Sequence, residues 1–402
     1  MNPIRKIAKA IRDNSSYKTA KRATKSVSKT NKSKRVVFIC QCESVWLKSE
    51  PVYLLLKERG VDCKLLVVDD PAVEKRTESI FDKYRKDVVR YYPGVIDELN
   101  PRIVFYSRPY DHYLPKDIRS SAVVKKALLA YIPYYIYQNA DDNGLLEKRF
   151  ADRISFYFAD QPESAKQFRE ICKKGIKNGH LHCLEFGYPF LETISELYKK
   201  GDTTNSAFIK NTNGIKVIWT PRWEYGGYYG GSNFLKYKDL IFDYFLNNDK
   251  YSFVFRPHPL MFNNFIKKGL ITEQDKEGLL KRIDESSNAV YDYSGDYIPT
   301  LIDADYLISD NSSIVLEFST FNKPLLYCSP NIQKSLSEFW HQIIDCNFFI
   351  TNAEKLKGII TVLEKKKVDE KAKLRRKLSD NIYHKNHGST KRIVDYIIEK
   401  LK

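Results

Sequence analysis

Two short segments in the second half of the sequence place polar side chains directly after apolar runs. Residues 219–223 read WTPRW, and residues 255–259 read FRPHP, in which His258 lies between two prolines. Proline restricts the backbone and lowers the entropy lost in holding a side chain in place. A guanidinium binds phosphate through paired hydrogen bonds, and a positioned imidazole donates or transfers a proton. The segments therefore predict Arg222, Arg256 and His258 as phosphate-binding or catalytic residues; a surface arginine and a histidine in a rigid turn are the alternatives.

A third segment, residues 309–318, reads SDNSSIVLEF and predicts a strand that turns into a helix. The first turn of a helix offers free N–H groups and a positive dipole end, which suit a phosphate. We expect Asp310, Ser312 and Ser313 to contribute to such a site, and Glu317 either to hold ribose hydroxyls or to face solvent. Ordinary capping of the helix by Asp310 or Ser312 is the alternative, and it is compatible with phosphate binding.

Short apolar runs and helical stretches alternate along most of the chain. The runs predict strands over 35–42, 64–68, 102–106, 153–159 and 181–186, and again over 216–220, 252–256, 289–293, 304–309 and 324–328. Helices are expected between them, including a long charged helix over 72–91 and a short helix over 314–320. Alternation of this kind is typical of a parallel sheet with helices on both faces.

The length of 402 residues exceeds the usual size of one domain, so the sequence predicts an α/β protein with two doubly wound, Rossmann-like lobes. The expected parts are a basic tail over 1–34, a first lobe over 35–198, a polar linker over 199–213, a second lobe over 214–380 and a closing helix over 381–402. Ligands of such folds bind at the carboxyl ends of the strands, and a cleft between two lobes is the expected active site.

The formal net charge is +17, and the basic excess is concentrated at the start of the chain, where residues 1–35 contain Asp13 as their one acidic residue. This excess favours anionic partners. One helical face gathers Ile4, Ile7, Ala8 and Ile11 among basic residues, which predicts a short amphipathic helix on an anionic membrane. A solvated tail is the alternative.

The seven cysteines are odd in number and scattered, which indicates reduced thiols in a cytoplasmic protein. Their spacing, including the pair Cys40 and Cys42, completes no metal site. No apolar run approaches the 18 or so residues of a spanning helix, and the start lacks the features of a secretory signal. No nucleic-acid-binding motif is found, so nucleic acid is not an expected partner.

The motifs FRPHP, SDNSSIVLEF and KPLLYCSPN, in this order and spacing, resemble those of the CDP-glycerol glycerophosphotransferases that build teichoic acids. Residues 219–223 and the HGSTKR stretch at 387–392 resemble further segments of that family. The likeness spans about 215–400 and is weak in the first lobe.

This resemblance implies a GT-B-like fold and a transferase that takes CDP-glycerol or another CDP-polyol as donor and a lipid-linked or polymer hydroxyl as acceptor. It implies that His258, Ser312 and Ser313 bind the donor diphosphate, and that the protein lies on the inner face of the cell membrane. No cofactor is implied, and a divalent ion on the diphosphate is left open. Many relatives carry a His-Gly pair in the first lobe that is proposed as the catalytic base. In this sequence Tyr131–Tyr137 stands at the corresponding place, so Asp111 and His112 are the nearest candidates for the base. The alternative is that these two residues lie in a charged surface loop.

Two other functions are compatible with the same residues. A GT-B glycosyltransferase would bind a nucleotide-sugar through an identical phosphate site and attack carbon rather than phosphorus. A polyanion-binding protein without catalytic activity would account for the positive net charge. An inactive protein of the same fold would account for the missing His-Gly pair.

Overall fold

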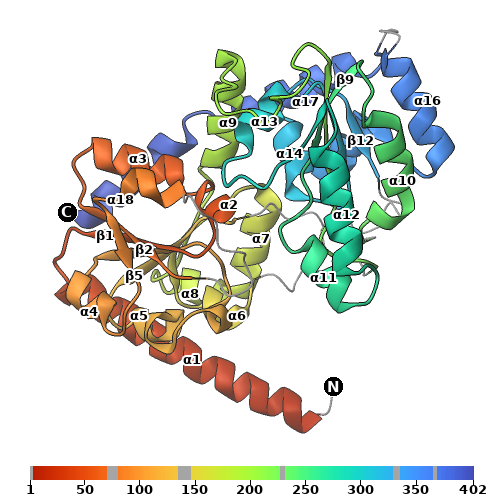
Figure 1. Cartoon of the computed structure of the whole chain (residues 1–402). Helices are drawn as coiled ribbons and strands as arrows, with labels where there is room; N and C mark the ends of the chain where they lie inside the picture. Colours follow the sequence, from red (N-terminus) through yellow and green to blue (C-terminus); the bar gives the residue numbers. More distant parts are fainter. Residues whose placement is uncertain (1–2, 70–79, 135–145, 227–230, 329–335, 365–368) are drawn as a thin grey trace. The chain divides into compact units, whose positions relative to one another are not determined.

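The computed structural model describes residues 3–69, 80–134, 146–226, 231–328, 336–364 and 369–402, with the side chains of the first helix described from Asp13 onward. The chain forms two compact units (Figure 1). Of the described residues, the first contains those within 3–69, 80–192 and 386–402, and the second contains those within 193–385. The last helix of the chain therefore belongs to the unit that the first residues begin.

The first unit is built on a seven-stranded parallel sheet with the order β3-β2-β1-β4-β5-β6-β7. Apolar residues on both faces explain the parallel arrangement, because helices must cover each side. The strands are β1 (Val36–Cys40), β2 (Cys63–Val67), β3 (Val88–Arg90), β4 (Ile103–Tyr106), β5 (Leu128–Tyr131), β6 (Ile154–Phe158) and β7 (His182–Leu184).

Helices cover both faces of this sheet. Side chains of α4 (Val95–Leu99), α5 (Ser120–Val123), α6 (Lys148–Ala151) and α7 (Pro162–Ile171) pack in one core cluster with the sheet. On the other face, Phe38 contacts the rings of Trp46 in α2 (Glu43–Trp46) and Tyr53 in α3 (Glu50–Glu58). The last helix, α18 (Ser389–Leu401), lies on the same face, where Tyr396 contacts Phe156 and Phe158. The short α8 (Lys173–Lys177) follows α7, and α9 (Pro189–Lys200) leads into the second unit.

The basic N-terminal segment forms one long helix, α1 (Pro3–Thr30), and its second half packs on the first unit. Ala20, Thr24 and Val27 are buried at helical spacing. Asp13 pairs with Arg149 at 2.9 Å, and the loop after α1 is fixed by Asn31, whose side-chain amide donates to Pro101 O and Lys126 O. The second half of the segment is therefore not a solvated tail, because the spacing of its small apolar residues provides a packing face, and the helix is longer than expected. Membrane contact by its first residues stays a prediction. The side chains of Ile4, Ile7, Ala8 and Ile11 lie outside those described.

The second unit repeats the same topology with a six-stranded parallel sheet of order β10-β9-β8-β11-β12-β13. Its strands are β8 (Ile215–Thr220), β9 (Tyr251–Phe255), β10 (Ala289–Tyr291), β11 (Tyr306–Ser309), β12 (Leu325–Tyr327) and β13 (Phe348–Phe349). Its helices are α10 (Phe234–Phe245), α11 (Met261–Lys267), α12 (Glu273–Asp284), α13 (Ile298–Asp303), α14 (Ser313–Phe318), α15 (Glu338–Asp345), α16 (Ala353–Glu364) and α17 (Ala372–Asn386). Aromatic side chains of α10 and α11 contact the rings of Trp219 and Phe255, one stacked and the others edge-to-face.

All ten strands predicted from apolar runs are present, whereas one expected helix was wrong. The long helix over 72–91 is replaced, in its described part, by a short 3₁₀ turn at Ile80–Tyr84 and the strand β3. The sequence DVVRYY is β-branched and aromatic there, which favours an edge strand over a helix. The two-residue strand β13 was too short to give a sequence signal. The predicted linker contains Phe208, which is buried, and Ser206, which donates to Asp303 of the second unit.

No helix in the described part of the chain is both long and apolar enough to cross a bilayer.

His180 is buried beside α1, and we expect its ionisation to make the stability of the first unit depend on pH. The residue is 5% exposed, its ring lies 5.6 Å from that of Tyr17, and neither of its nitrogens has a hydrogen-bond partner among the described residues. Burial, with the positive charges of Lys21 and Lys25 of α1 and the neighbouring His182, lowers its pKa from 6.5 to about 4.

Because the unfolded chain binds a proton below pH 6.5 that the folded chain does not bind until about pH 4, stability is lost as the pH falls across this window. We expect the free energy of unfolding to drop by about 1 to 3 kcal/mol over it. Urea unfolding of the wild type and of His180→Phe at a series of pH values measures this loss. The free energy of unfolding of His180→Phe should change less with pH than that of the wild type. His384→Phe, at an exposed position of α17, serves as the control. Equal pH slopes for His180→Phe and the wild type would contradict the expectation.

Candidate functional site

The three polar segments of the second unit lie at one edge of its sheet. Strands β9, β8 and β11 are neighbours, and Thr220 pairs with Ser309 while Trp219 pairs with Phe255. The chain runs from β8 outward through β9 and β10, and then returns to β11 on the other side of β8. The carboxyl ends of β8 and β11 therefore form the topological switch point at which doubly wound sheets bind ligands.

Asp310 joins the loops around this switch point. Its carboxylate, which is buried, accepts hydrogen bonds from Arg222 N at 2.9 Å, from Asn233 Nδ2 at 2.9 Å and from Ser232 Oγ at 3.3 Å. Burial raises its pKa to about 6, although these donors act in the opposite direction. Asp310 was predicted to bind substrate; in the structure its oxygens hold the loop after β8 and the start of α10.

Arg222 extends from the loop after β8 across the switch point. Its Nη1 donates to Asn311 O at 2.8 Å, and its Nη2 lies 3.5 Å from Glu224 Oε2. The guanidinium is thus held by the loop after β11 and lies beside the segment that starts α14. This placement suits the predicted contact with a phosphate at the same edge.

His258 is an exposed residue in the turn that follows β9. Its backbone N–H donates to Pro221 O at 3.0 Å, which ties the two proline-containing loops together. The ring Nδ1 accepts from Leu260 N at 3.1 Å, so in the neutral imidazole the proton is assigned to Nε2. The side chain therefore presents Nε2–H as a donor on the outside of the turn, as a group that contacts a phosphate oxygen requires.

Ser312 and Ser313 begin α14. Ser312 is its N-cap, and its Oγ accepts from Ile314 N at 3.4 Å; Ser313 is the first helical residue, and both are half-buried. The capping alternative therefore applies to Ser312, and donor binding by either serine stays a prediction. Glu317, on the same helix, is buried and accepts from Tyr297 Oη at 2.7 Å, so it faces the protein interior.

Arg256 is buried in an ion pair. Its Nη1 lies 2.6 Å from Asp292 Oδ2, its Nη2 donates to Ser294 O, and Tyr297 stacks on the guanidinium. Burial opposes ionisation of Asp292, but Arg256 and Ser294 outweigh it and lower the pKa of that carboxyl. The structure thus gives Arg256 a role in fixing the loops after β9 and β10, and direct substrate binding by it stays a prediction.

Asp111 and His112, the candidate bases of the first unit, lie in a 3₁₀ turn after β4. Asp111 accepts from Ser120 N at 2.7 Å and Ser120 Oγ at 2.6 Å, and pairs with Arg153 at 3.1 Å. Arg153 in turn donates to Ser16 of α1. Asp111 therefore holds the start of α5 in place, whereas His112 is exposed beside Tyr113.

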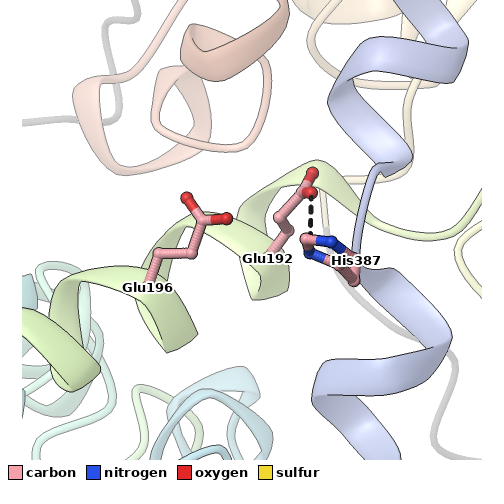
Figure 2. A group of neighbouring side chains, drawn as sticks. All are labelled: Glu192, Glu196 and His387. Carbon is pink, nitrogen blue, oxygen red and sulfur yellow. Dashed lines mark ion pairs between the residues drawn. The ribbon is translucent and has the colours of Figure 1, made fainter.

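Glu192, Glu196 and His387 form a group with metal-ligand residue types in the described part of the chain (Figure 2). Glu192 lies 4.0 Å from His387 Nδ1, and Glu196 is one turn further along α9. The carboxylate of Glu192 already accepts from Gly388 N, from Ser389 Oγ and from the N–H and hydroxyl of Thr390. A carboxylate has about four acceptor positions, so these bonds use them. We therefore interpret Glu192 as the cap of α18 and assign no metal to the group.

Sequence reasoning missed the residues that support the site. Ser232 and Asn233 precede α10, where a polar pair before an apolar helix is a capping signal, but nothing local connects them to Asp310. Glu192 caps a helix that starts about 200 residues later, so only the folded structure reveals the contact.

Comparison with known proteins gives a family match and several similar folds. The sequence model of the family described as CDP-glycerol:poly(glycerophosphate) glycerophosphotransferase matches residues 145–399, more than half of the chain. A search of curated protein sequences finds no match. The solved structure of the wall teichoic acid polymerase TagF is similar with a TM-score of 0.57 at 13% identity, over 100% of this chain and 99% of that chain.

A UDP-GlcNAc 2-epimerase from Neisseria meningitidis, solved with UDP-GlcNAc bound, is similar with a TM-score of 0.54 at 13% identity, over 91% of this chain and 100% of that one. A putative UDP-N-acetylglucosamine 2-epimerase from Listeria monocytogenes has a TM-score of 0.57 at 11% identity, over 90% and 95%. At these identities the structures show the fold alone. They confirm the predicted fold class of two Rossmann-like units of the GT-B type.

Substitution of Asp310 should mainly lower the stability of the protein, whereas substitution of Ser312 and Ser313 should mainly lower its affinity for a nucleotide. Asp310→Ala leaves several buried donors without an acceptor, so we expect the free energy of unfolding to fall by about 3 kcal/mol. Ser312→Ala with Ser313→Ala should cost about 1 kcal/mol through the lost cap, and should weaken the binding of cytidine diphosphate. Urea unfolding and calorimetric titration measure the two effects. Unchanged nucleotide affinity in the folded serine variant would leave capping as the only role of these residues.

Proposed function

This chain belongs to the CDP-glycerol:poly(glycerophosphate) glycerophosphotransferase family, and from this premise we propose that it transfers a polyol phosphate from a CDP-activated donor to a hydroxyl of a teichoic-acid-like or capsular polymer. The observation that carries the proposal is the switch point of the second unit. Within the segment that matches the family, it gathers Arg222, His258 and the serines of α14 at neighbouring strand ends. CDP-glycerol is the donor that the family description supports.

In the proposed reaction the acceptor hydroxyl attacks the β-phosphorus of the donor. A bond forms between the acceptor oxygen and phosphorus, the bond to CMP breaks, and CMP leaves with the electron pair. Such transfers depend mainly on positioning and on neutralising charge on the phosphoryl oxygens. Arg222 would neutralise charge on the diphosphate, His258 would donate Nε2–H to one of its oxygens, and Ser313 at the start of α14 would add a hydroxyl.

In this proposal the buried residues at the carboxyl ends of β9 and β11 fix the loops that bind the donor. Asp310 and Arg256 hold the loops that carry Arg222 and His258, through the contacts given above. Arg256 is ion-paired with Asp292 and the Asp310 carboxylate is hydrogen-bonded by Arg222 N, Ser232 and Asn233, so the donor would meet a site whose loops are already in place. Preorganisation of this kind lowers the reorganisation needed when charge develops in the transition state.

Incubation with CDP-glycerol, CDP-ribitol and a set of nucleotide-sugars, each with an oligo(glycerol phosphate) acceptor, tests the proposal. We expect CMP release with a new phosphodiester, fastest with a CDP-polyol. His258→Ala should lower this turnover by about 10²–10³ because one charge-stabilising donor is lost. His384→Ala at an exposed position of α17 is the matched control. A glycosidic product with release of a nucleoside diphosphate would instead identify a glycosyltransferase.

We also propose that the protein works in the cytoplasm at the inner face of the membrane and that the first residues of α1 provide the contact. Residues 3–12 contain Arg5, Lys6, Lys9 and Arg12 and no acidic residue. Each basic residue near an anionic leaflet contributes about 1 kcal/mol. Residues 13–31 pack on the first unit, so a deletion that tests the contact must end at Arg12.

Deletion of residues 2–12 should release the protein from vesicles that contain phosphatidylglycerol and should leave its melting temperature unchanged. Sedimentation at low and high salt measures the binding, which screening should weaken in the full-length chain. Vesicles of phosphatidylcholine alone are the control. Equal sedimentation of both proteins on anionic vesicles would contradict the proposal.

A further inference from the structure

The docked half of α1 carries lysines that no carboxylate balances. Lys21 and Lys25 lie one turn apart, the first half-buried and the second exposed, and neither forms an ion pair with a residue that the structure describes. Asp13, the one acidic residue of this basic segment, is already paired with Arg149 at 2.9 Å. Uncompensated cations that are held on a docked helix attract anions to a defined place on the surface.

His180 is buried beside these lysines. Its ring lies 5.6 Å from that of Tyr17, and the backbone of α8 packs on it so closely that a Cβ at Gly175 would lie 3.4 Å from His180 Cε1. Both ring nitrogens are buried, and neither has a hydrogen-bond partner among the described residues. Since buried polar groups in native proteins are nearly always paired, the imidazole indicates a partner from outside the chain.

The charges that act on this imidazole are all positive. Burial lowers the pKa of His180 most, and the charges of Lys21, Lys25 and the neighbouring His182 lower it further, to about 4. His182 is in turn affected by burial and by the charge of Lys400 in α18, which lower its pKa. In the described part of the chain no carboxylate offsets these charges at His180, so each of them attracts an anion that binds here.

Two hydroxyl groups lie on the same side of α1. Tyr17, Lys21 and Thr24 follow one another at spacings of four and three residues, which places them on one stripe of a helix. Tyr17 Oη accepts from Asn178 Nδ2 at 2.8 Å, and its own hydrogen remains to be donated. Thr24 is 3% exposed, and its Oγ1 has no partner within the described ranges. The stripe therefore adds hydroxyl donors to the ammonium groups.

The cluster lies at the amino-terminal edge of the first unit's sheet. His180 precedes β7, and the last turn of α1 is held by Arg102, which precedes β4 and donates from Nη1 to Val27 O at 2.9 Å. Ligands of doubly wound sheets bind at the opposite, carboxyl edge. The cluster therefore does not belong to the carboxyl edge of either unit.

We propose that α1 and His180 form a phosphate-binding site that takes up a proton together with its anion. The ammonium groups of Lys21 and Lys25 and the hydroxyl of Tyr17 hold the phosphate oxygens, and His180 becomes an imidazolium with a proton from solvent. The bound phosphate neutralises the two lysines that oppose this protonation. By linkage, phosphate and proton then increase each other's affinity by the same factor.

The ligand is a phosphate group, and two sources can supply it. One is a free phosphate ion or phosphate ester, and the other is the headgroup of an anionic lipid at the membrane. Both present the same tetrahedral oxyanion to the lysines, so the site is tested first with a small anion and then with vesicles.

Sulfate tests the coupling, because it is a tetrahedral oxyanion whose charge does not change over the range in which His180 titrates. Proton NMR follows the imidazole signal, assigned with His180→Phe, over a pH series in sodium chloride and in sodium sulfate of equal ionic strength. We expect sulfate to raise the proton affinity of His180 about tenfold. Calorimetric titration should show sulfate affinity rising by the same factor as the pH falls. An unchanged titration in saturating sulfate, as a water molecule in this place would give, overturns the proposal.

Substitution of the two lysines separates a built site from general attraction. Lys21→Met with Lys25→Met should lower sulfate affinity at least about tenfold. It should also raise the proton affinity of His180 without any anion, after which sulfate has no further effect. The matched control is Lys18→Met with Lys29→Met, which removes the same charge from exposed positions of the same helix that do not act on His180. Equal losses of sulfate affinity in the two variants would contradict the site.

Vesicles identify the source of the phosphate. If the site takes a lipid headgroup, the Lys21 and Lys25 variant should sediment less with phosphatidylglycerol vesicles than the Lys18 and Lys29 variant does. If it takes a free phosphate, the two variants should sediment alike while only the first loses sulfate. Either result supports the site. None of these measurements uses a CDP-linked donor, so a failure of the proposed transfer activity would leave them unchanged.

Discussion

The arrangement of the second unit's active edge depends on the burial of one carboxylate. Asp310 is removed from water at the end of β11, and the cost of this burial is offset only if donors from other loops surround it. The backbone of Arg222 and the side chains of Ser232 and Asn233 supply them. The loop after β8 and the start of α10 are thereby fixed to the end of β11, and every group proposed to meet the donor diphosphate is attached to one of these segments or bonded to it. A substitution at Asp310 would disturb all of them together.

The two units share a topology but differ in the chemistry of their edges. The second unit presents Arg222, His258 and hydroxyl groups, which suit an anion. At the carboxyl edge of the first unit's sheet, Gln41 and Ser107, which follow β1 and β4, are neutral, and Asp160 is the ionisable group that follows β6.

Much of the fold followed from local sequence, and less of the site did. Apolar runs identified the longer strands since burial on both faces of a parallel sheet demands continuous apolar residues. The motif residues were placed correctly at strand ends for the same reason. Their contacts within the protein were harder to predict. Arg256 and Asp310 bond Asp292, Ser232 and Asn233, which lie 36 to 78 residues away in the sequence, and no local pattern indicates these pairs.

The return of α18 to the first unit has a consequence for how the chain is made. Ribosomal synthesis releases β1 to β7 long before residues 389–401, yet Ile393, Val394 and Ile397 are buried in this unit and Tyr396 covers the rings of Phe156 and Phe158. Until residues 389–401 have been synthesised, Phe156 and Phe158 lack the cover of Tyr396, while all of the second unit has already been synthesised. Maturation therefore does not proceed from the N-terminus to the C-terminus. A chain cut before residue 389 would therefore expose apolar side chains of the first unit and would be prone to aggregate.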